Sequence, residues 1–258
     1  MILNRSRGPD VPCLHRIFSV QPSGSHKIHK SIGMSVELEE IREKLEDLNN
    51  LAITLELPER SVLVTFDDGW VDSLQLMESF KNNTKLQPVL FLTTNHLMGD
   101  TGLLPLPRLY AWCESWSLNI DSIPQFGITR EWLKSLPENT QHAVLDSLDI
   151  PRASQSPEIL GSREISRLID EGWIVGSHAH DHHDLRFDSV TELRDGLKHA
   201  LEITLQNGGI PWLAWPEGRC TQETCRIADE VGFTKQFSLN VEAGAIDFPT
   251  LVHREIWS

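Results

Sequence analysis

Apolar residues along this chain gather in short runs that end at Gly, Pro, Asn, Asp or Ser, a pattern typical of buried strands. Seven such runs predict strands at residues 11–15, 61–66, 88–93, 173–177, 210–215, 234–239 and 250–256. The segments between them carry apolar residues at helical spacing. Alternation of this kind is expected when parallel strands are joined by helical crossovers, and seven strands suggest a barrel.

One helical face is clear in the segment 35–48, where Ser35 is a good N-cap candidate. The apolar residues on this face are Val36, Leu38, Ile41, Leu45 and Leu48. Further helices are predicted at residues 72–81, 162–171, 189–206 and 221–231.

The alternation of strands and helices is interrupted from about residue 99 to residue 161. This segment contains several prolines around short amphipathic stretches such as 130–136. We interpret it as an insertion of short helices within a single domain that spans residues 1–258. Such an insertion either walls a site or only adds packing.

Composition supports one globular domain with a full core, because 258 residues with 40% hydrophobic content are enough for an α/β barrel. The formal charge of -14 disfavours nucleic acid and anionic membranes, so a glycan or small-molecule substrate is expected. We find no transmembrane or signal-peptide run and four scattered cysteines, which favour a cytoplasmic protein with reduced thiols. The oligomeric state is not indicated.

Two adjacent carboxylates, Asp67 and Asp68, follow the apolar run 61–64 and precede Gly69. Burial and mutual repulsion would raise the pKa of at least one of them unless a cation or hydrogen-bond donors stabilise the pair. A metal ion is the obvious candidate, with one Asp on the ion and the other facing a nucleophile.

Four histidines within six residues follow the predicted strand 173–177: His178, His180, His182 and His183. Two imidazoles and a carboxylate suit Zn, Fe, Co or Ni and leave positions open for water and substrate. A solvated histidine patch or a pH sensor is the alternative. Because both motifs end strands, as barrel active sites do, we favour a catalytic centre.

The string Thr-Phe-Asp-Asp-Gly at 65–69, followed by Gly-Ser-His-x-x-x-His-x-Asp-Leu at 176–185, resembles the polysaccharide deacetylase family. The resemblance extends from about Val11 to Trp257. It implies a distorted (β/α)7-type barrel and metal-dependent removal of N-acetyl groups from amino sugars.

By this resemblance Asp67 corresponds to the general base, and Asp68, His178 and His182 correspond to the metal ligands. The expected cofactor is one divalent ion; zinc is the first choice, while Co, Ni, Fe or Mn also suit the ligands. His180 and His183 lie off the matched positions, and we interpret them as neighbours of the site.

The segment 214–218 resembles more weakly the family's loop that helps to hold the oxyanion, through Pro216, Glu217 and Gly218. Two positions depart from the family pattern. Ala214 stands where many members have an arginine that orients the catalytic Asp, and Glu217 replaces an aromatic residue. A backbone donor survives side-chain replacement, so the oxyanion role can persist while the orientation of Asp67 must come from elsewhere.

Two histidines compete for the role of the acid that protonates the leaving group. His15 lies in Pro-Cys-Leu-His-Arg-Ile, which resembles the Tyr-His-x-Ile segment at the start of one branch of the family. His253 lies on the last predicted strand, where other branches carry this residue. We favour His15. Arg254 can pair with Asp67 or Glu255, and we treat it as structural.

Trp70 and Trp215 adjoin the proposed catalytic loops. Their rings either stack on a sugar or fill the core.

The leading hypothesis is therefore a metal-dependent N-deacetylase that acts on an amino sugar in a soluble or lipid-linked glycan precursor. One alternative is a hydrolase of cyclic ureides or imides on the same barrel. A barrel that binds glycan without turnover is another. A metallo-β-lactamase-type histidine cluster fits poorly, because His182 stands where that motif needs Asp and the Asp67–Asp68 pair stays unexplained.

Overall fold

The computed structural model describes residues 11–19, 25–98, 104–118, 127–152, 159–239 and 246–258. Parallel strands close into a barrel in which each neighbour follows in chain order and the last pairs with the first. Its strands are β1 (Val11–Leu14), β4 (Val62–Phe66), β5 (Leu86–Leu92), β6 (Ile174–Ser177), β7 (Trp212–Ala214), β8 (Lys235–Leu239) and β9 (Leu251–Ile256). All seven predicted strands are confirmed, and so is the (β/α)7-type barrel.

An apolar cluster occupies part of the barrel interior. It consists of Val89, Phe91, Ala214 and Phe237, and the rings of Phe91 and Phe237 lie 4.9 Å apart. Gly176 on β6 makes room for this packing, since a Cβ there would come within 2.8 Å of the Phe91 ring.

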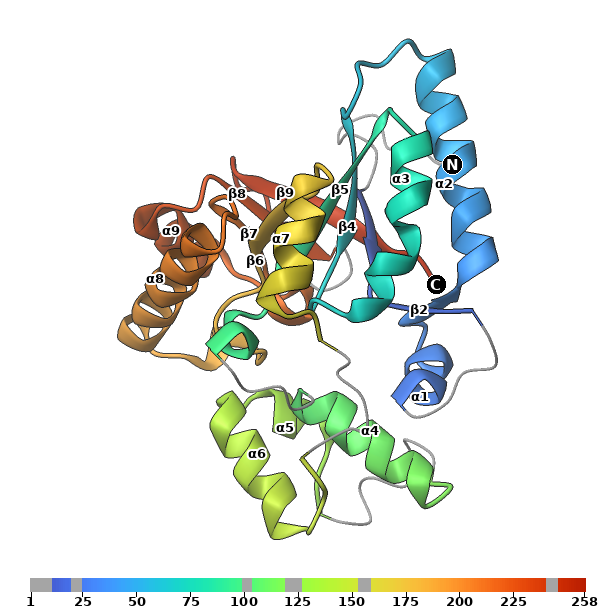
Figure 1. The fold of residues 1–258 in the computed structure, drawn as a ribbon. Helices are drawn as coiled ribbons and strands as arrows, with labels where there is room; N and C mark the ends of the chain where they lie inside the picture. The colour runs from blue at the N-terminus through green and yellow to red at the C-terminus, as the bar shows by residue number, and fades with distance from the viewer. Residues whose placement is uncertain (1–10, 20–24, 99–103, 119–126, 153–158, 240–245) are drawn as a thin grey trace.

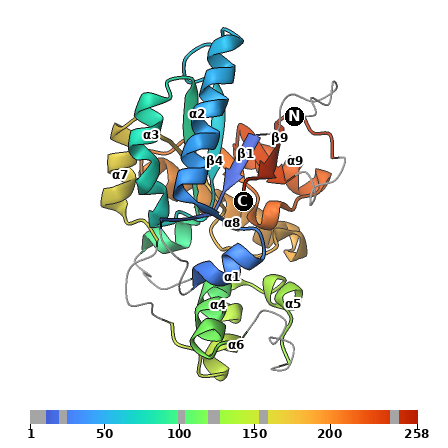
Figure 2. The same ribbon diagram turned by 90° about the vertical axis from the view of Figure 1, so that its right-hand side faces the viewer.

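Helices surround the barrel (Figures 1 and 2). They include α2 (Leu38–Thr54), α3 (Met77–Asn82) after the 3-10 segment η1 (Val71–Leu76), α7 (Ser162–Asp170), α8 (Val190–Gln206) and α9 (Gln222–Val231). A layer of Phe66, Phe80 and Trp173 packs among β4, α2, α3 and α7, with ring centroids 5.1–5.8 Å apart. The apolar residues of the face predicted at 35–48 all belong to, or pack against, one hydrophobic cluster: Val36, Leu38, Ile41, Leu45 and Leu48.

The start of α2 differs from the prediction. Ser35 lies in β3 (Ser35–Glu37), which pairs in parallel with β2 (Arg16–Phe18), and the sequence indicated neither strand. The helix begins at Leu38, where the Glu37 carboxylate accepts the backbone N–H of Glu40. Ser35 is therefore not the N-cap.

The insertion forms a separate group of helices, α4 (Pro105–Ser115), α5 (Arg130–Lys134) and α6 (Glu138–Ser147). They share a hydrophobic cluster that includes Leu109, Leu133 and Leu145, and α1 (Ser25–Ser31) joins it through Ile28. Figure 1 shows this group below the barrel. Its place matters because the strands direct their carboxyl ends toward it.

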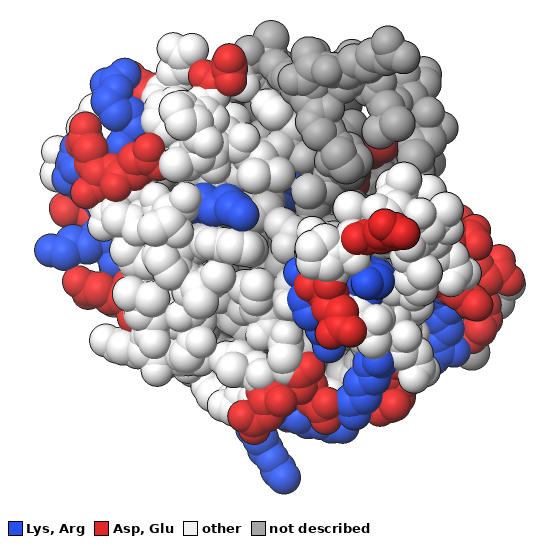
Figure 3. All heavy atoms as spheres, turned by 90° about the horizontal axis from the view of Figure 1, so that it is seen from above, with Lys and Arg blue, Asp and Glu red and all other residues white. Residues whose placement is uncertain are grey.

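On the face seen from above, acidic and basic side chains lie next to one another around the edge (Figure 3). The charge of -14 does not gather there into a patch of one sign. Among the described residues no helix is long and apolar enough to cross a membrane.

Candidate active site

The ends of three barrel strands, β1, β4 and β6, bring the predicted residues together. Asp67 and Asp68 follow β4, His15 follows β1, and His178 follows β6. Backbone hydrogen bonds continue past the strand ends, from Asp67 N to Leu14 O at 3.0 Å and from His178 N to Leu92 O at 2.7 Å. Because parallel strands end on one edge, distant segments meet at the mouth of the barrel.

A left-handed turn directs the Asp68 carboxylate over this mouth. Asp68 has φ +69° and Gly69 has φ +80°, and a Cβ at Gly69 would lie 2.7 Å from the Leu92 side chain. The indole N–H of Trp70 donates to Asp68 Oδ2 at 2.9 Å. One carboxylate oxygen is thus held by the protein, and the other is directed toward the histidines.

That second oxygen, Asp68 Oδ1, lies 3.4 Å from His178 Nε2 and 3.1 Å from His182 Nε2. It is buried and accepts no hydrogen bond of full geometry, so its contacts with the protein are these two imidazoles, which pair with it only when they are protonated. One ligand atom from each of the three residues lies within 4.8 Å of the others. The three predicted ligands therefore converge as a site for a cation requires.

Neighbouring groups orient the two imidazoles. His178 Nδ1 lies 2.9 Å from the Ala214 carbonyl oxygen, so this nitrogen carries the hydrogen and the Nε2 lone pair faces Asp68. The backbone N–H of His182 donates to Glu138 Oε2 at 2.9 Å. Burial alone would lower the pKa of His182, but the Asp68 carboxylate outweighs it and raises the pKa to about 9. The same field favours any positive charge placed between these groups.

Asp67 is held by a buried arginine. Arg254 Nη1 donates to Oδ1 at 2.6 Å and Nη2 donates to Oδ2 at 2.8 Å, a bidentate pair inside the barrel. Burial favours a higher pKa for Asp67, but Arg254 and then His178 outweigh it, and the pKa falls from 3.8 to about 2. Of the two partners predicted for Arg254, the contact is with Asp67. Arg254 on β9 therefore provides the cation beside Asp67 that the residue at position 214, an alanine, does not provide.

The two candidate acids lie in different places. His15 lines the same pocket as Asp67, with its Nε2 3.9 Å from Asp67 Oδ2. Burial lowers the pKa of His15 in spite of the nearby carboxylates. His253 points away from the barrel interior, because it neighbours the inward-facing Arg254, and its nitrogens contact Ser238 Oγ at 3.3 Å and the Ile246 carbonyl at 3.1 Å. The structure thus excludes His253 from the site and leaves His15.

Neither tryptophan can stack on a substrate. Trp70 is buried beneath the Arg16 guanidinium, which lies 4.0 Å from its ring, and positions Asp68 instead. Trp215 is fully buried and donates from Nε1 to Gln236 Oε1 at 3.1 Å. Of the two roles that the sequence left open, burial therefore holds for both residues and sugar stacking does not.

The third motif forms a tight turn, η5 (Pro216–Gly218), at the edge of the pocket. Glu217 has φ +58° and Gly218 has φ +67°. The N–H of Gly218 donates to the Trp215 carbonyl at 2.9 Å, and that of Arg219 donates to the Pro216 carbonyl at 3.2 Å. The Glu217 carboxylate forms an ion pair with Lys134 of α5.

The other histidines of the cluster turn away from Asp68. His183 Nε2 lies 2.8 Å from Asp188 Oδ1, and His180 Nδ1 lies 3.0 Å from Thr94 Oγ1. A second group of possible ligands exists beside the first, made of Cys13, His15 and Asp67. Both oxygens of Asp67 already accept from Arg254, so this second group fits a cation less well than the first.

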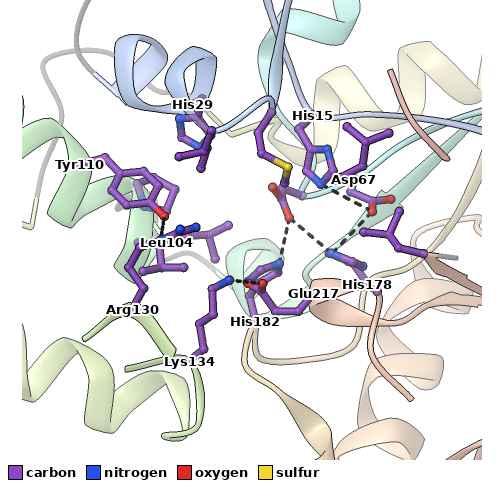
Figure 4. A pocket seen from close by; sticks show the side chains of 18 of the residues that line it. His15, His29, Asp67, Leu104, Tyr110, Arg130, Lys134, His178, His182 and Glu217 are labelled. Atoms are coloured by element: carbon purple, nitrogen blue, oxygen red, sulfur yellow. Dashed lines mark hydrogen bonds and ion pairs between the residues drawn. The ribbon is translucent and has the colours of Figure 1, made fainter. Parts of the chain in front are cut away.

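A cavity of about 270 Å³ is lined by His15, Asp67, Asp68, His178 and His182 (Figure 4). The barrel forms one wall, which carries the aspartates and histidines described above. The insertion forms another with Tyr110 of α4 and with Arg130 and Lys134 of α5. Sequence reasoning did not identify these three residues, because nothing in a segment of short helices indicates which surface they cover.

Comparison with known proteins gives consistent results. A family model described as polysaccharide deacetylase matches residues 54–235. The structure of the deacetylase PplD from Streptococcus pyogenes in complex with acetate has 15% identity and a TM-score of 0.58, and the match covers 96% of this chain and 92% of that one. IcaB from Ammonifex degensii has 16% identity and a TM-score of 0.58, with 98% and 93% covered. No curated protein sequence matches the chain.

Proposed function

The chain belongs to the polysaccharide deacetylase family, hydrolases that remove N-acetyl groups from glycans, and on this premise we propose that it does so with one divalent ion held by Asp68, His178 and His182. The observation that supports this most is the buried Asp68 Oδ1, which accepts no hydrogen bond of full geometry and is directed at two imidazole nitrogens. One carboxylate and two imidazoles suit zinc first, and Co, Ni, Fe or Mn as well. When bound, the ion would polarise the amide carbonyl and acidify a water molecule.

Asp67 is the proposed general base. Its ionised carboxylate lies beside the ligand cluster, with Oδ2 4.0 Å from His178 Nε2, and can accept a proton from the attacking water. The bidentate contact with Arg254 fixes the plane of the carboxylate. This contact also makes Asp67 a weak base, so the reaction needs a water that is already acidified.

His15 is the proposed acid. Its Nε2 is 3.9 Å from Asp67 Oδ2, so a small movement lets it receive a proton and deliver it to the leaving amine nitrogen. For the oxyanion we propose the backbone N–H of Glu217. The next two N–H groups in this turn, those of Gly218 and Arg219, already donate to carbonyl oxygens of the same turn.

We also keep a cytoplasmic location as part of the proposal. Cys13, Cys113, Cys220 and Cys225 are all buried and unpaired, as is usual in a reducing compartment.

The test combines metal content with acetate release from N-acetylglucosamine oligomers. Chelated protein should be inactive and should recover with about one equivalent of zinc. Asp68→Asn should lose the ion, whereas Asp67→Asn should keep it and lose activity by about 10²–10⁴-fold. Asp195→Asn, an exposed position on α8, is the matched control. Full activity of chelated protein or of Asp68→Asn would overturn the proposal.

A further inference from the structure

Charged groups on the insertion side of the pocket are nearly all paired with one another. Lys134 forms an ion pair with Glu217 and lies 3.8 Å from Glu131. Arg219 lies 2.8 Å from Glu131 and 3.4 Å from Asp184. In such pairs the charge is largely satisfied within the protein, so they provide little attraction for a charged substrate.

Arg130 is the exception. It lines the pocket, and its Nε donates to the Tyr110 hydroxyl at 2.8 Å. Within the described part of the chain it forms no ion pair with a carboxylate, and its guanidinium carbon lies 5.7 Å from the centre of the Tyr110 ring. The remaining N–H groups of its planar fork are thus available for a partner in the pocket.

Tyr110 complements this cation. Its oxygen accepts the Arg130 N–H, which leaves its own proton to donate to another acceptor. Burial raises the pKa of Tyr110 to about 12, so the hydroxyl keeps this proton at neutral pH. Two donor groups, one of them charged, therefore lie side by side in the pocket wall.

Their place in the pocket is separate from the catalytic cluster. Figure 4 shows Tyr110 and Arg130 on one side, His15 and Asp67 on the other, and Lys134 with Glu217 between them. A sugar whose N-acetyl group reaches Asp67 would thus direct another substituent, or a neighbouring sugar, toward Arg130.

We propose that Arg130 and Tyr110 form a subsite for an oxyanion, so that the preferred substrate is an N-acetylated amino sugar that carries a carboxylate or a phosphate group. The guanidinium fork matches both groups in geometry and charge. Burying this cation beneath an uncharged sugar would leave it without a counter-ion, which disfavours neutral substrates. The inference rests on the proposed deacetylase function, because that function places the N-acetyl group of the sugar at Asp67 and the rest of the sugar toward Arg130.

Binding and turnover should be measured with three probes: N-acetylglucosamine, its 6-phosphate, and 2-acetamido-2-deoxyglucuronic acid. We expect at least one anionic probe to bind about 10- to 100-fold more tightly than the neutral sugar, as one charge-assisted contact provides. Arg130→Gln should abolish this preference and change the affinity for the neutral sugar by less than about twofold. Tyr110→Phe should reduce the preference by about three- to tenfold.

Arg163→Gln is the matched control, because Arg163 is exposed on α7 and does not line the pocket. The two anionic probes show whether the subsite takes phosphate, carboxylate or both. The inference would be overturned if the wild-type protein bound all three probes with equal affinity. It would also be overturned if Arg130→Gln lowered the affinity for all three probes by the same factor. Calorimetric binding needs no turnover, so failure of deacetylation would leave this test intact.

Discussion

The Arg254–Asp67 pair allows the sharpest test of how this site is held, through the variant Arg254→Met. Both side chains are buried, and the guanidinium also donates to Thr65 Oγ1 at 3.1 Å. Removing one partner of a buried ion pair leaves the other charge uncompensated, at about 3–5 kcal/mol in the free energy of unfolding. For a chain of this size, that corresponds to a fall in Tm of roughly 6–20 °C.

The pKa of Asp67 gives a second, independent value for the contribution of its charged surroundings to the free energy of unfolding. A shift from 3.8 to about 2 corresponds to about 2–3 kcal/mol. Because the pKa is lower in the folded state, this stabilisation is complete above about pH 4 and is lost as the pH falls toward 2. The mutational value is larger because it also includes the cost of leaving the carboxylate buried without its cation.

Urea unfolding at pH 7 measures the effect through a double-mutant cycle. Asp67→Asn removes the charge of the partner, so Arg254→Met should cost at least about 2 kcal/mol less in that background than in the wild type. Arg194→Met is the control: Arg194 forms an exposed pair with Glu230 at 2.6 Å, and its loss should cost at most about 1 kcal/mol. Equal costs of Arg254→Met in both backgrounds would refute the reasoning.

Three further variants test other parts of the site and fold. Trp70→Phe removes the donor to Asp68 Oδ2 and should weaken zinc affinity by about 10- to 100-fold in a competition titration, so an unchanged affinity would contradict the positioning role. Gly218→Ala places a Cβ 2.5 Å from Leu239, so it should lower the free energy of unfolding by about 1–3 kcal/mol and should also lower turnover. Gly196→Ala is the control, because a Cβ added there meets no atom within 4 Å, and it should lower neither quantity. Ser189→Ala removes the capping box of α8 and should cost about 1 kcal/mol in urea unfolding with unchanged turnover, whereas a loss of activity would show that this cap affects the site.

The barrel was predictable mainly through strands such as β5, which is buried along its whole length and therefore appears as a nearly continuous apolar run. The short strands β2 and β3 were not, since three residues leave too little pattern. Ser35 shows the difficulty: a serine before an apolar helical repeat is a typical N-cap, yet the pairing of β3 with β2 places it in a strand.

Within the site, the local motifs predicted which side chains converge, because Asp67, Asp68 and His178 all follow strands that end at one edge. Which residues of β9 point into the barrel was not predictable. His253 and Arg254 are adjacent on one strand, so one must point inward and the other outward, and only the register of the closed barrel decides which.

Burial of the tryptophans and the position of the insertion also depend on tertiary packing. Trp70 and Trp215 adjoin the proposed catalytic loops in sequence, but both rings are buried. Tyr110 and Arg130 reach the pocket only because α4 and α5 pack below the barrel, which no local pattern encodes.

The account depends most on a single cation shared by Asp68, His178 and His182, and anomalous diffraction from zinc-loaded crystals tests this directly. We expect one peak at about 2.0–2.2 Å from Asp68 Oδ1 and from both Nε2 atoms. A peak bonded instead to the Cys13 sulfur at about 2.3 Å, or no peak near Asp68, would contradict the account.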